Sequence, residues 1–192
     1  MMHRKSLLFI LSAPAGTGKT TLINRLVKEQ QHICRSLTFT TRLPRKNEVN
    51  GVDYNFVTHE CFQEKITKGD FLEYVFLFDH YYGTCRKTIA TQLEQGKHVF
   101  LVIDTQGALK IKAQDKPIRI FLSPPSIEEL KSRLILRKTE TLDKIDKRVK
   151  WAKKELNCIQ HYDYNIINDN IDEAYEILKA IVKAEEHRIS NK

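Results

Sequence analysis

Residues 7–20 read Leu-Leu-Phe-Ile-Leu-Ser-Ala-Pro-Ala-Gly-Thr-Gly-Lys-Thr, and this stretch decides the fold. A short apolar run leads into a small-residue loop that closes on Gly16, Gly18, Lys19 and Thr20, and an amphipathic stretch follows at once. Buried strand, glycine loop and helix are the context of a phosphate-binding P-loop. The glycines let backbone N–H groups face phosphate oxygens, and the N-terminus of the helix favours an anion.

The loop departs from the strict P-loop pattern at one position. The pattern G-x-x-x-x-G-K-[ST] begins with glycine, and this chain has Ala13 there. One methyl group costs little if the backbone does not need a positive φ, so we expect Ala13 to be tolerated. Lys19 is expected to bring a positive charge to the outer phosphates, and the Thr20 hydroxyl is expected to ligate Mg²⁺.

Composition excludes several other classes of protein. The apolar run before the loop has five residues, whereas the core of a secretory signal has roughly seven to fifteen. No apolar run approaches the roughly eighteen residues of a membrane span. The cysteines Cys34, Cys61, Cys85 and Cys158 are scattered without a C-x-x-C motif, so neither a zinc site nor a disulfide framework is indicated. The 192 residues therefore predict one cytosolic domain.

Positive charge is concentrated in one segment. Of the net charge of +8, residues 131–154 hold ten Lys/Arg against three Asp/Glu, which leaves +7 there. Such a segment indicates an anionic partner, either nucleic acid or a nucleotide phosphate tail, and the alternative is a solvated helix face. Because no aromatic residues interleave the basic ones in a groove pattern, we do not expect nucleic acid to be the partner.

The order of expected elements indicates an α/β fold. After the first strand and a helix near 19–30, the pattern predicts one strand over 34–40, strands over 53–57 and 71–78 around a helix near 59–68, a helix over 87–95, strands over 98–104 and 118–122, a helix from about 126, a helix over about 142–160, a strand over 164–167 and a final helix capped by Asn170. The strand-rich block breaks the βαβ rhythm, so we expect an insertion into a parallel-sheet core. One buried strand ends in Asp104, where such sheets place functional residues.

Three further polar residues stand out before any family is considered. Arg42 and Arg45 lie three apart on a loop, and planar guanidinium groups pair well with phosphate, although ordinary surface charge is the alternative. Glu73 lies in an otherwise apolar strand, so its carboxylate must find hydrogen-bond donors or face a cavity.

Taken in order, these motifs closely resemble those of the guanylate kinase family, nucleoside monophosphate kinases that transfer a phosphoryl group from ATP to GMP. The resemblance runs from about Ser6 to Arg188 and rests on Ser12-Ala-Pro-Ala-Gly-Thr-Gly-Lys-Thr20, Thr40-Thr-Arg-Leu-Pro-Arg45, Glu48 with Gly51-Val-Asp-Tyr54, Phe71-Leu-Glu73, Tyr81-Tyr-Gly-Thr84, Ile103-Asp-Thr-Gln-Gly-Ala108, Pro124-Pro-Ser126, Arg133-Leu134 with Arg137, and Tyr162-Asp-Tyr164 with Asn168-Asp169. It implies one domain over 1–192. Its parts would be a P-loop core (6–35, 91–130 and 156–190), a mixed α/β GMP-binding subdomain at about 36–90 and a helical lid at about 131–155.

The resemblance also implies a role for each motif residue. ATP would be bound by Ala13, Pro14, Ala15, Gly16, Thr17, Gly18, Lys19, Thr20, Arg133 and Asn168. GMP would be bound by Thr38, Arg42, Arg45, Glu48, Tyr54, Glu73, Tyr82, Thr84 and Asp104. Catalytic positive charge would come from Lys19, Arg42, Arg137 and Arg148, and Thr20 would hold Mg²⁺ together with the ATP phosphates.

Recognition of guanine follows from its donors and acceptors. Guanine offers acceptors at O6 and N7 and donors at N1 and the exocyclic amine. Glu73 would accept from those donors, and the hydroxyls of Thr38 and Thr84 would donate to the acceptor edge. Adenine would leave the carboxylate unpaired. The implied activity is ATP-dependent phosphorylation of GMP and dGMP to the diphosphates. Its partners would be small molecules, without nucleic acid or membrane, and a homodimer is compatible with it.

Three departures from the family pattern remain. Val102 stands where the family usually has a second acid, so the cleft has one carboxylate fewer near the metal. Leu136 and Lys138 replace glycines that are common around the lid arginine, which should stiffen the lid helix. Thr38 and Thr84 stand where serine is common, and they keep the hydroxyl.

Two alternative functions would leave different patterns in the sequence. A guanylate-kinase-like binding module without catalysis would have a broken P-loop, whereas Lys19 and Thr20 are present. A kinase that acts on a sugar phosphate would not need the residues implied to recognise guanine, which are Glu73, Thr38 and Thr84.

Overall fold

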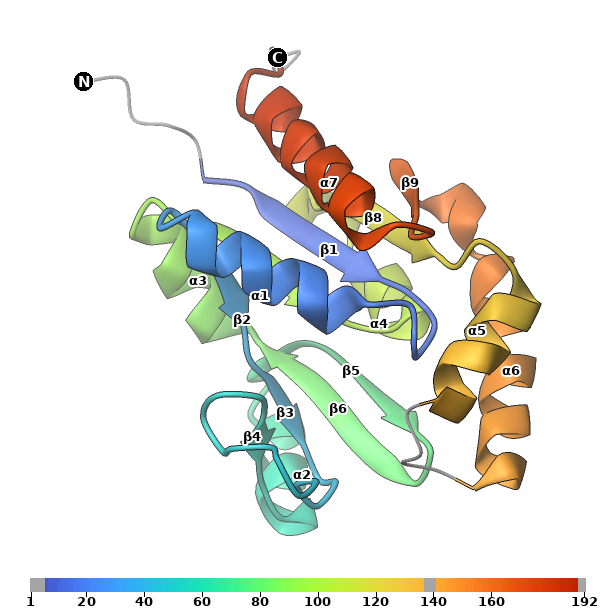
Figure 1. Ribbon diagram of the computed structural model, residues 1–192. Helices are drawn as coiled ribbons and strands as arrows, with labels where there is room; N and C mark the ends of the chain where they lie inside the picture. The colour runs from blue at the N-terminus through green and yellow to red at the C-terminus, as the bar shows by residue number, and fades with distance from the viewer. Residues whose placement is uncertain (1–5, 137–140, 190–192) are drawn as a thin grey trace.

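The computed structural model describes residues 6–136 and 141–189, and its core is a five-stranded parallel sheet (Figure 1). The strands lie in the order β2-β7-β1-β8-β9, and every pairing is parallel. They are β1 (Leu8–Ser12), β2 (Ile33–Ser36), β7 (His98–Val102), β8 (Ile118–Ser123) and β9 (Tyr164–Ile167). The expected parallel core is therefore confirmed.

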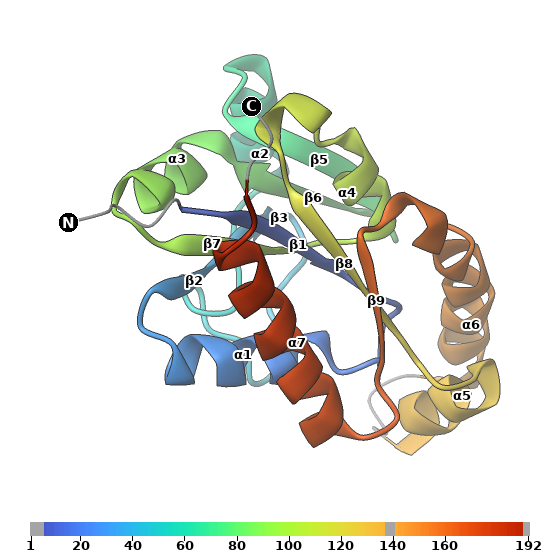
Figure 2. The same ribbon diagram turned by 90° about the horizontal axis from the view of Figure 1, so that it is seen from above.

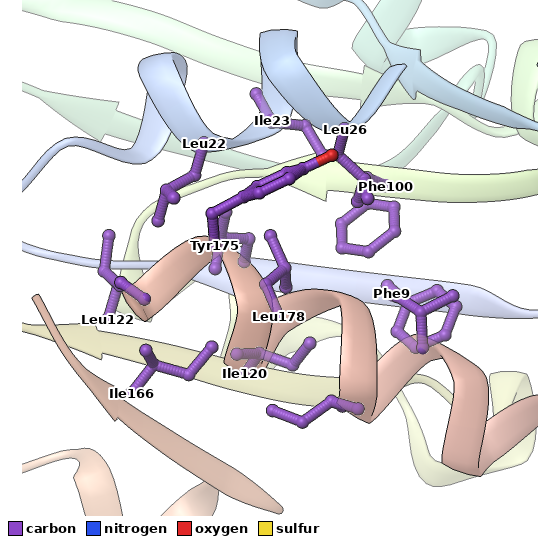
Figure 3. Close-up of a cluster of buried hydrophobic side chains, with 14 of the residues drawn as sticks. Phe9, Leu22, Ile23, Leu26, Phe100, Ile120, Leu122, Ile166, Tyr175 and Leu178 are labelled. Carbon is purple, nitrogen blue, oxygen red and sulfur yellow. The ribbon is translucent and has the colours of Figure 1, made fainter. Parts of the chain in front are cut away.

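Helices cover both faces of this sheet, which Figure 2 shows from above. One face carries α1 (Lys19–Glu29) and α7 (Ile171–Glu186), and the other carries α3 (Arg86–Glu94) and α4 (Thr105–Lys110). Successive residues of β1 face opposite helix layers, so the whole strand is buried and reads as a continuous apolar run. On the α1–α7 side, Tyr175 and Leu178 pack over Phe9 and Phe100 (Figure 3).

A second, four-stranded sheet lies in the order β4-β3-β6-β5. Its strands are β3 (Thr38–Thr40), β4 (Asn55–Phe56), β5 (Phe71–Leu77) and β6 (His80–Cys85), and α2 (His59–Thr67) packs against it through Phe62. The single strand predicted over 34–40 is wrong. The chain leaves the parallel sheet after Ser36 and enters the second sheet at Thr38, because the two halves pair with different strands.

Two helices, α5 (Ile127–Leu136) and α6 (Leu142–Leu156), pack against each other through Leu130, Leu134, Ile145 and Ala152. The predicted helix over 142–160 is too long, because α6 ends at Leu156 and a 3₁₀ turn follows at Ile159–His161. A second 3₁₀ turn lies at Ala113–Asp115. Arg137 and Lys138, both named above, lie outside the described residues.

Side chains cap two of the helices, including the Asn170 cap that the sequence predicts. The Ser126 hydroxyl accepts from the Glu129 N–H (3.0 Å), and the Asn170 side chain accepts from the N–H groups of Asp172 and Glu173 (2.8 and 3.2 Å). These bonds satisfy donors that the first turn of a helix leaves without a partner. Within residues 6–136 and 141–189, no helix is both long and apolar enough to cross a bilayer.

Candidate active site

The loop between β1 and α1 has the backbone of a P-loop. Gly16 and Gly18 have φ values of 96° and 100°, in the region that favours glycine, whereas Ala13 is not among the residues with positive φ. Alanine is therefore compatible with the backbone at position 13, as expected. The Lys19 Nζ donates to the Ala13 carbonyl and lies 3.5 Å from the Pro14 carbonyl, so the lysine folds back over the loop.

Asn168, at the end of β9, braces this loop. Its Nδ2 donates to the Thr17 carbonyl (2.6 Å), and its side chain is buried. A Cβ at Gly18 would lie 2.6 Å from the same nitrogen, so glycine is required there for packing as well as for backbone conformation. Arg133 of α5 donates to the Asn168 carbonyl (2.8 Å) and to Glu129 (2.8 Å). Arg133 and Asn168, which are predicted to bind ATP but lie outside the loop in sequence, therefore lie next to the loop in the structure.

Three buried polar side chains converge in the second sheet. Thr38 of β3 lies opposite Thr84 of β6, and Thr84 lies opposite Glu73 of β5. Side chains directly opposite one another across strands project to the same face of a sheet. Thr84 Oγ1 donates to Glu73 Oε1 at 2.6 Å, and Glu73 is only 5% exposed. The three predicted guanine-reading residues therefore form one constellation.

The pKa of Glu73 is raised to about 7, chiefly by burial; the Thr84 hydrogen bond lowers the pKa, and the negative charge of Asp104 raises it. The other carboxylate oxygen, Oε2, faces the start of α4, where a Cβ at Gly107 would lie 2.6 Å from it. A side chain at position 107 would push Glu73 out of place. The sequence motif contains Gly107, but the spacing alone did not give it this role.

The residues predicted to hold the GMP phosphate lie around Glu48. Its carboxylate accepts from Arg42 Nη2 (2.9 Å) and from the Arg45 N–H (2.9 Å). The Arg42 guanidinium lies 5.3 Å from the ring centre of Tyr54, whose ring in turn lies 6.4 Å from that of Tyr82. Glu48 therefore holds the Arg42 side chain and the Arg45 backbone, and Tyr54 lies beside the Arg42 guanidinium.

A cluster of charged groups joins the P-loop to α6. Asp104 caps α4 by accepting from the Gly107 N–H (2.7 Å), and burial raises its pKa while the charge of Lys19 lowers it. Glu155 of α6 is 5% exposed. Burial raises the pKa of Glu155 to about 7, against the positive charges of Lys19 and Arg148 and with the negative charge of Asp104. Two carboxylates and two cations thus lie together.

Sequence reasoning missed Glu155. A usable signal was present, because Glu155 follows Arg148 by seven residues and so lies on the same face of the helix. Val102, the position of the missing acid, packs into the apolar cluster beneath α1. No residue of β7 carries a carboxylate, and the other buried acid whose charge interacts with Asp104 and Lys19 is Glu155 of α6.

Another group of potential metal ligands lies at the opposite end of the sheet. The Nε2 atoms of His32 and His98 lie 3.1 and 3.2 Å from Glu186 Oε1. His98 Nδ1 accepts from the Leu7 N–H (3.0 Å), so the neutral ring carries its proton on Nε2 and donates it to Glu186. This tautomer favours a hydrogen-bonded clasp between α7 and the sheet over a metal site.

Comparisons with known proteins agree on one family. A sequence model described as guanylate kinase matches residues 5–185. The guanylate kinase of Protochlamydia amoebophila (strain UWE25) is 54% identical over 189 residues, covering 98% of this chain and 96% of the relative. That of Chlamydia trachomatis serovar D is 44% identical over 185 residues, covering 96% and 90%. The crystal structure of guanylate kinase from Anaplasma phagocytophilum superposes with a TM-score of 0.80 at 32% identity, covering 96% of this chain and 88% of that one.

Proposed function

Because this chain belongs to the guanylate kinase family and phosphorylates GMP with ATP, we propose how its own residues carry out that transfer. The three parts would be the P-loop core, a GMP-binding subdomain at about 36–90 and a lid at about 131–155. The separate sheet of β3 to β6 and the separate apolar cluster between α5 and α6 support this division.

The observation that carries the acceptor specificity is the buried carboxylate of Glu73. In the proposed complex, Glu73 accepts from guanine N1–H and the exocyclic amine, while Thr38 and Thr84 donate to the acceptor edge. Burial supports this assignment, since a carboxylate that has lost water gains most from two well-placed donors. Adenine offers no donor pair to that position, so AMP would leave Glu73 uncompensated.

The GMP phosphate would be held by Arg42, Arg45, Tyr54 and Tyr82. Its oxygen attacks the terminal phosphorus of ATP in line as the bond to the ADP oxygen breaks, so GDP and ADP result. Lys19, Arg148 and Arg137 would neutralise the charge that spreads over the transferred group. For the GMP phosphate, support comes from Glu48, which accepts from the Arg42 guanidinium and from the Arg45 backbone N–H and so holds both residues at the proposed site.

Mg²⁺ would be held by the Thr20 hydroxyl together with the phosphates, with Asp104 and Glu155 nearby. The fit is chemical: Thr20 is solvent-exposed at the start of α1, and hydroxyl and carboxylate oxygens are the ligands that hard cations prefer. When bound, the ion would neutralise phosphate charge. We also propose that the enzyme acts in the cytosol, where its four free cysteines would stay reduced.

Glu155 is proposed to be the shared counter-charge of Lys19 and Arg148. Glu155→Gln is expected to lower kcat about tenfold, because both cations lose the partner that orients them. At pH 8 the variant should be at least as stable toward unfolding as the wild type, because it has no charged carboxylate to bury.

Steady-state kinetics and thermal unfolding check this, with Asp143→Asn as the matched control. Asp143 is a solvent-exposed acid in the first turn of the same helix, so its variant should keep the wild-type kcat. A wild-type kcat in Glu155→Gln would remove Glu155 from the mechanism.

Use of dGMP tests the proposed mode of binding. The proposed contacts all fall on guanine and phosphate, so a missing 2′-hydroxyl should change kcat/KM by no more than about tenfold. A coupled ADP-release assay with GMP and dGMP over a Mg²⁺ titration measures this. Loss of activity with dGMP alone would mean that the ribose is read by a residue outside the proposed set.

A further inference from the structure

The tip of the β5–β6 hairpin carries a bulky side chain on an unfavourable backbone. Phe78 and Asp79 form the connection between the two strands, with φ values of 50° and 66°. Two-residue hairpin turns of this kind favour Asn and Gly, and Asp is tolerated. Phenylalanine with a positive φ is a true outlier, and such strain persists only where the surroundings over-determine it.

The partners of Phe78 lie on the lid helix. Its ring packs edge-to-face against Trp151 of α6, with centroids 5.8 Å apart and planes at 64°. The guanidinium carbon of Arg148 lies 5.6 Å from the centre of the same ring. Figures 1 and 2 both show the hairpin reaching α6. The tip of the second sheet therefore contacts the helix that carries a proposed catalytic arginine.

Arg148 is held from two sides. The Phe78 ring attracts the guanidinium through its π face, and the buried carboxylate of Glu155 attracts it by charge. Trp151 lies between these two positions in the helix and closes the contact; its Nε1 is buried without a hydrogen-bond partner among the described residues.

We propose that Phe78 is a positioning residue, which ties the GMP-binding hairpin to the lid and sets the orientation of Arg148 toward the transferred phosphoryl group. The inference rests on the proposed function only for the role of Arg148. This role explains why the strained residue is a phenylalanine. The favoured turn residues, glycine and asparagine, have no aromatic ring that could contact the lid.

Variants at this turn are well suited to a test because they relieve strain. Glycine and asparagine both accept a positive φ, so Phe78→Gly and Phe78→Asn are expected to fold at least as well as the wild type. Asp79→Gly is the matched control, since it changes the other turn residue and keeps the ring. Phe78→Tyr restores an aromatic face and should rescue whatever the glycine variant loses.

Trp151 is the only tryptophan in the chain, so its fluorescence reports on this contact directly. In Phe78→Gly we expect red-shifted emission, greater acrylamide quenching and a kcat lower by about tenfold, with KM for GMP changed less than about twofold. Asp79→Gly and Phe78→Tyr should behave as the wild type in all four measurements.

Arg148→Ala, measured in parallel, separates this inference from the proposed function. The double variant with Phe78→Gly should be no slower than Arg148→Ala alone, because the ring acts through the arginine. Unchanged Trp151 emission in Phe78→Gly, or altered emission with a wild-type kcat, would overturn the inference while Arg148 keeps its role. A wild-type kcat in Arg148→Ala would instead overturn the role of Arg148, and the inference with it.

Discussion

Replacing Lys19 by methionine is expected to lower kcat by about 10²- to 10³-fold and to leave the fold intact. Methionine keeps the approximate length and apolar stem of the side chain but removes the charge that, in the proposed mechanism, faces the transferred phosphoryl group. The lysine folds over the loop onto the Ala13 and Pro14 carbonyls, at the N-terminus of α1, so its charge is already placed where phosphates would arrive.

A coupled assay with ATP and GMP measures the loss, and circular dichroism shows whether the fold persists. Lys28→Met is the matched control, because Lys28 is an exposed lysine in the last turn of the same helix and faces no proposed ligand. Its variant should keep the wild-type rate. Comparable turnover in Lys19→Met would show that the loop is not the donor site.

Glu73→Gln is the second large effect: kcat/KM for GMP should fall by about 10²-fold while KM for ATP stays unchanged. Glutamine keeps the size of the side chain and can still accept from Thr84. It loses the charge that is proposed to pair with two guanine donors, and its amide group cannot accept at both positions. Unchanged GMP kinetics would mean that Glu73 is only structural.

The affinity for GMP should depend on pH more strongly in the wild type than in Glu73→Gln. Since burial raises the pKa of Glu73 to about 7, the carboxyl is increasingly protonated below that pH and must lose its proton to accept from guanine. Wild-type affinity for GMP should therefore fall by up to about tenfold per pH unit below 7. Titration calorimetry on both proteins isolates this effect, because the phosphate of GMP titrates equally in each.

The stability of the wild type should depend on pH in the opposite direction to its GMP affinity, falling as the pH rises. A carboxyl whose pKa is raised by folding binds its proton more tightly in the folded state, so wild-type stability is lost as pH rises from the ordinary value of 4.5 through about 7. Glu73→Gln has no charge to bury and should be more stable than the wild type at pH 8, by at most about 3 kcal/mol. At pH 4.5 the two should be nearly equal. Urea unfolding at both pH values checks this.

Most of the core fold could be predicted from the sequence because its signals are local. The apolar run of β1, the glycines after it and the amphipathic α1 specify strand, loop and helix within one short stretch. Partner choice is not local. Residues 33–36 and 38–40 have the same β-forming character, and only the strands available on each side assign them to different sheets.

The sequence motifs single out residues within one segment, whereas contacts between distant elements leave no local pattern. Gly107 leaves room for Glu73, which approaches from another sheet, and the charge of Glu155 on α6 interacts with that of Lys19. Phe78 can be singled out only from the structure, which shows its positive φ and its contact with Trp151 of α6. Asn168 shows the converse: its motif position implies ATP binding, and the structure shows its amide bracing the loop that would bind ATP.

Acceptor selectivity tests the central claim, that a buried carboxylate and two threonines make guanine the base this kinase reads. The measurement is a coupled ADP-release assay with ATP and Mg²⁺ against GMP, dGMP, AMP, UMP and a sugar phosphate. We predict turnover with GMP and dGMP and a kcat/KM at least about 10³-fold lower for the other acceptors. Comparable turnover of AMP, UMP or the sugar phosphate would contradict the account.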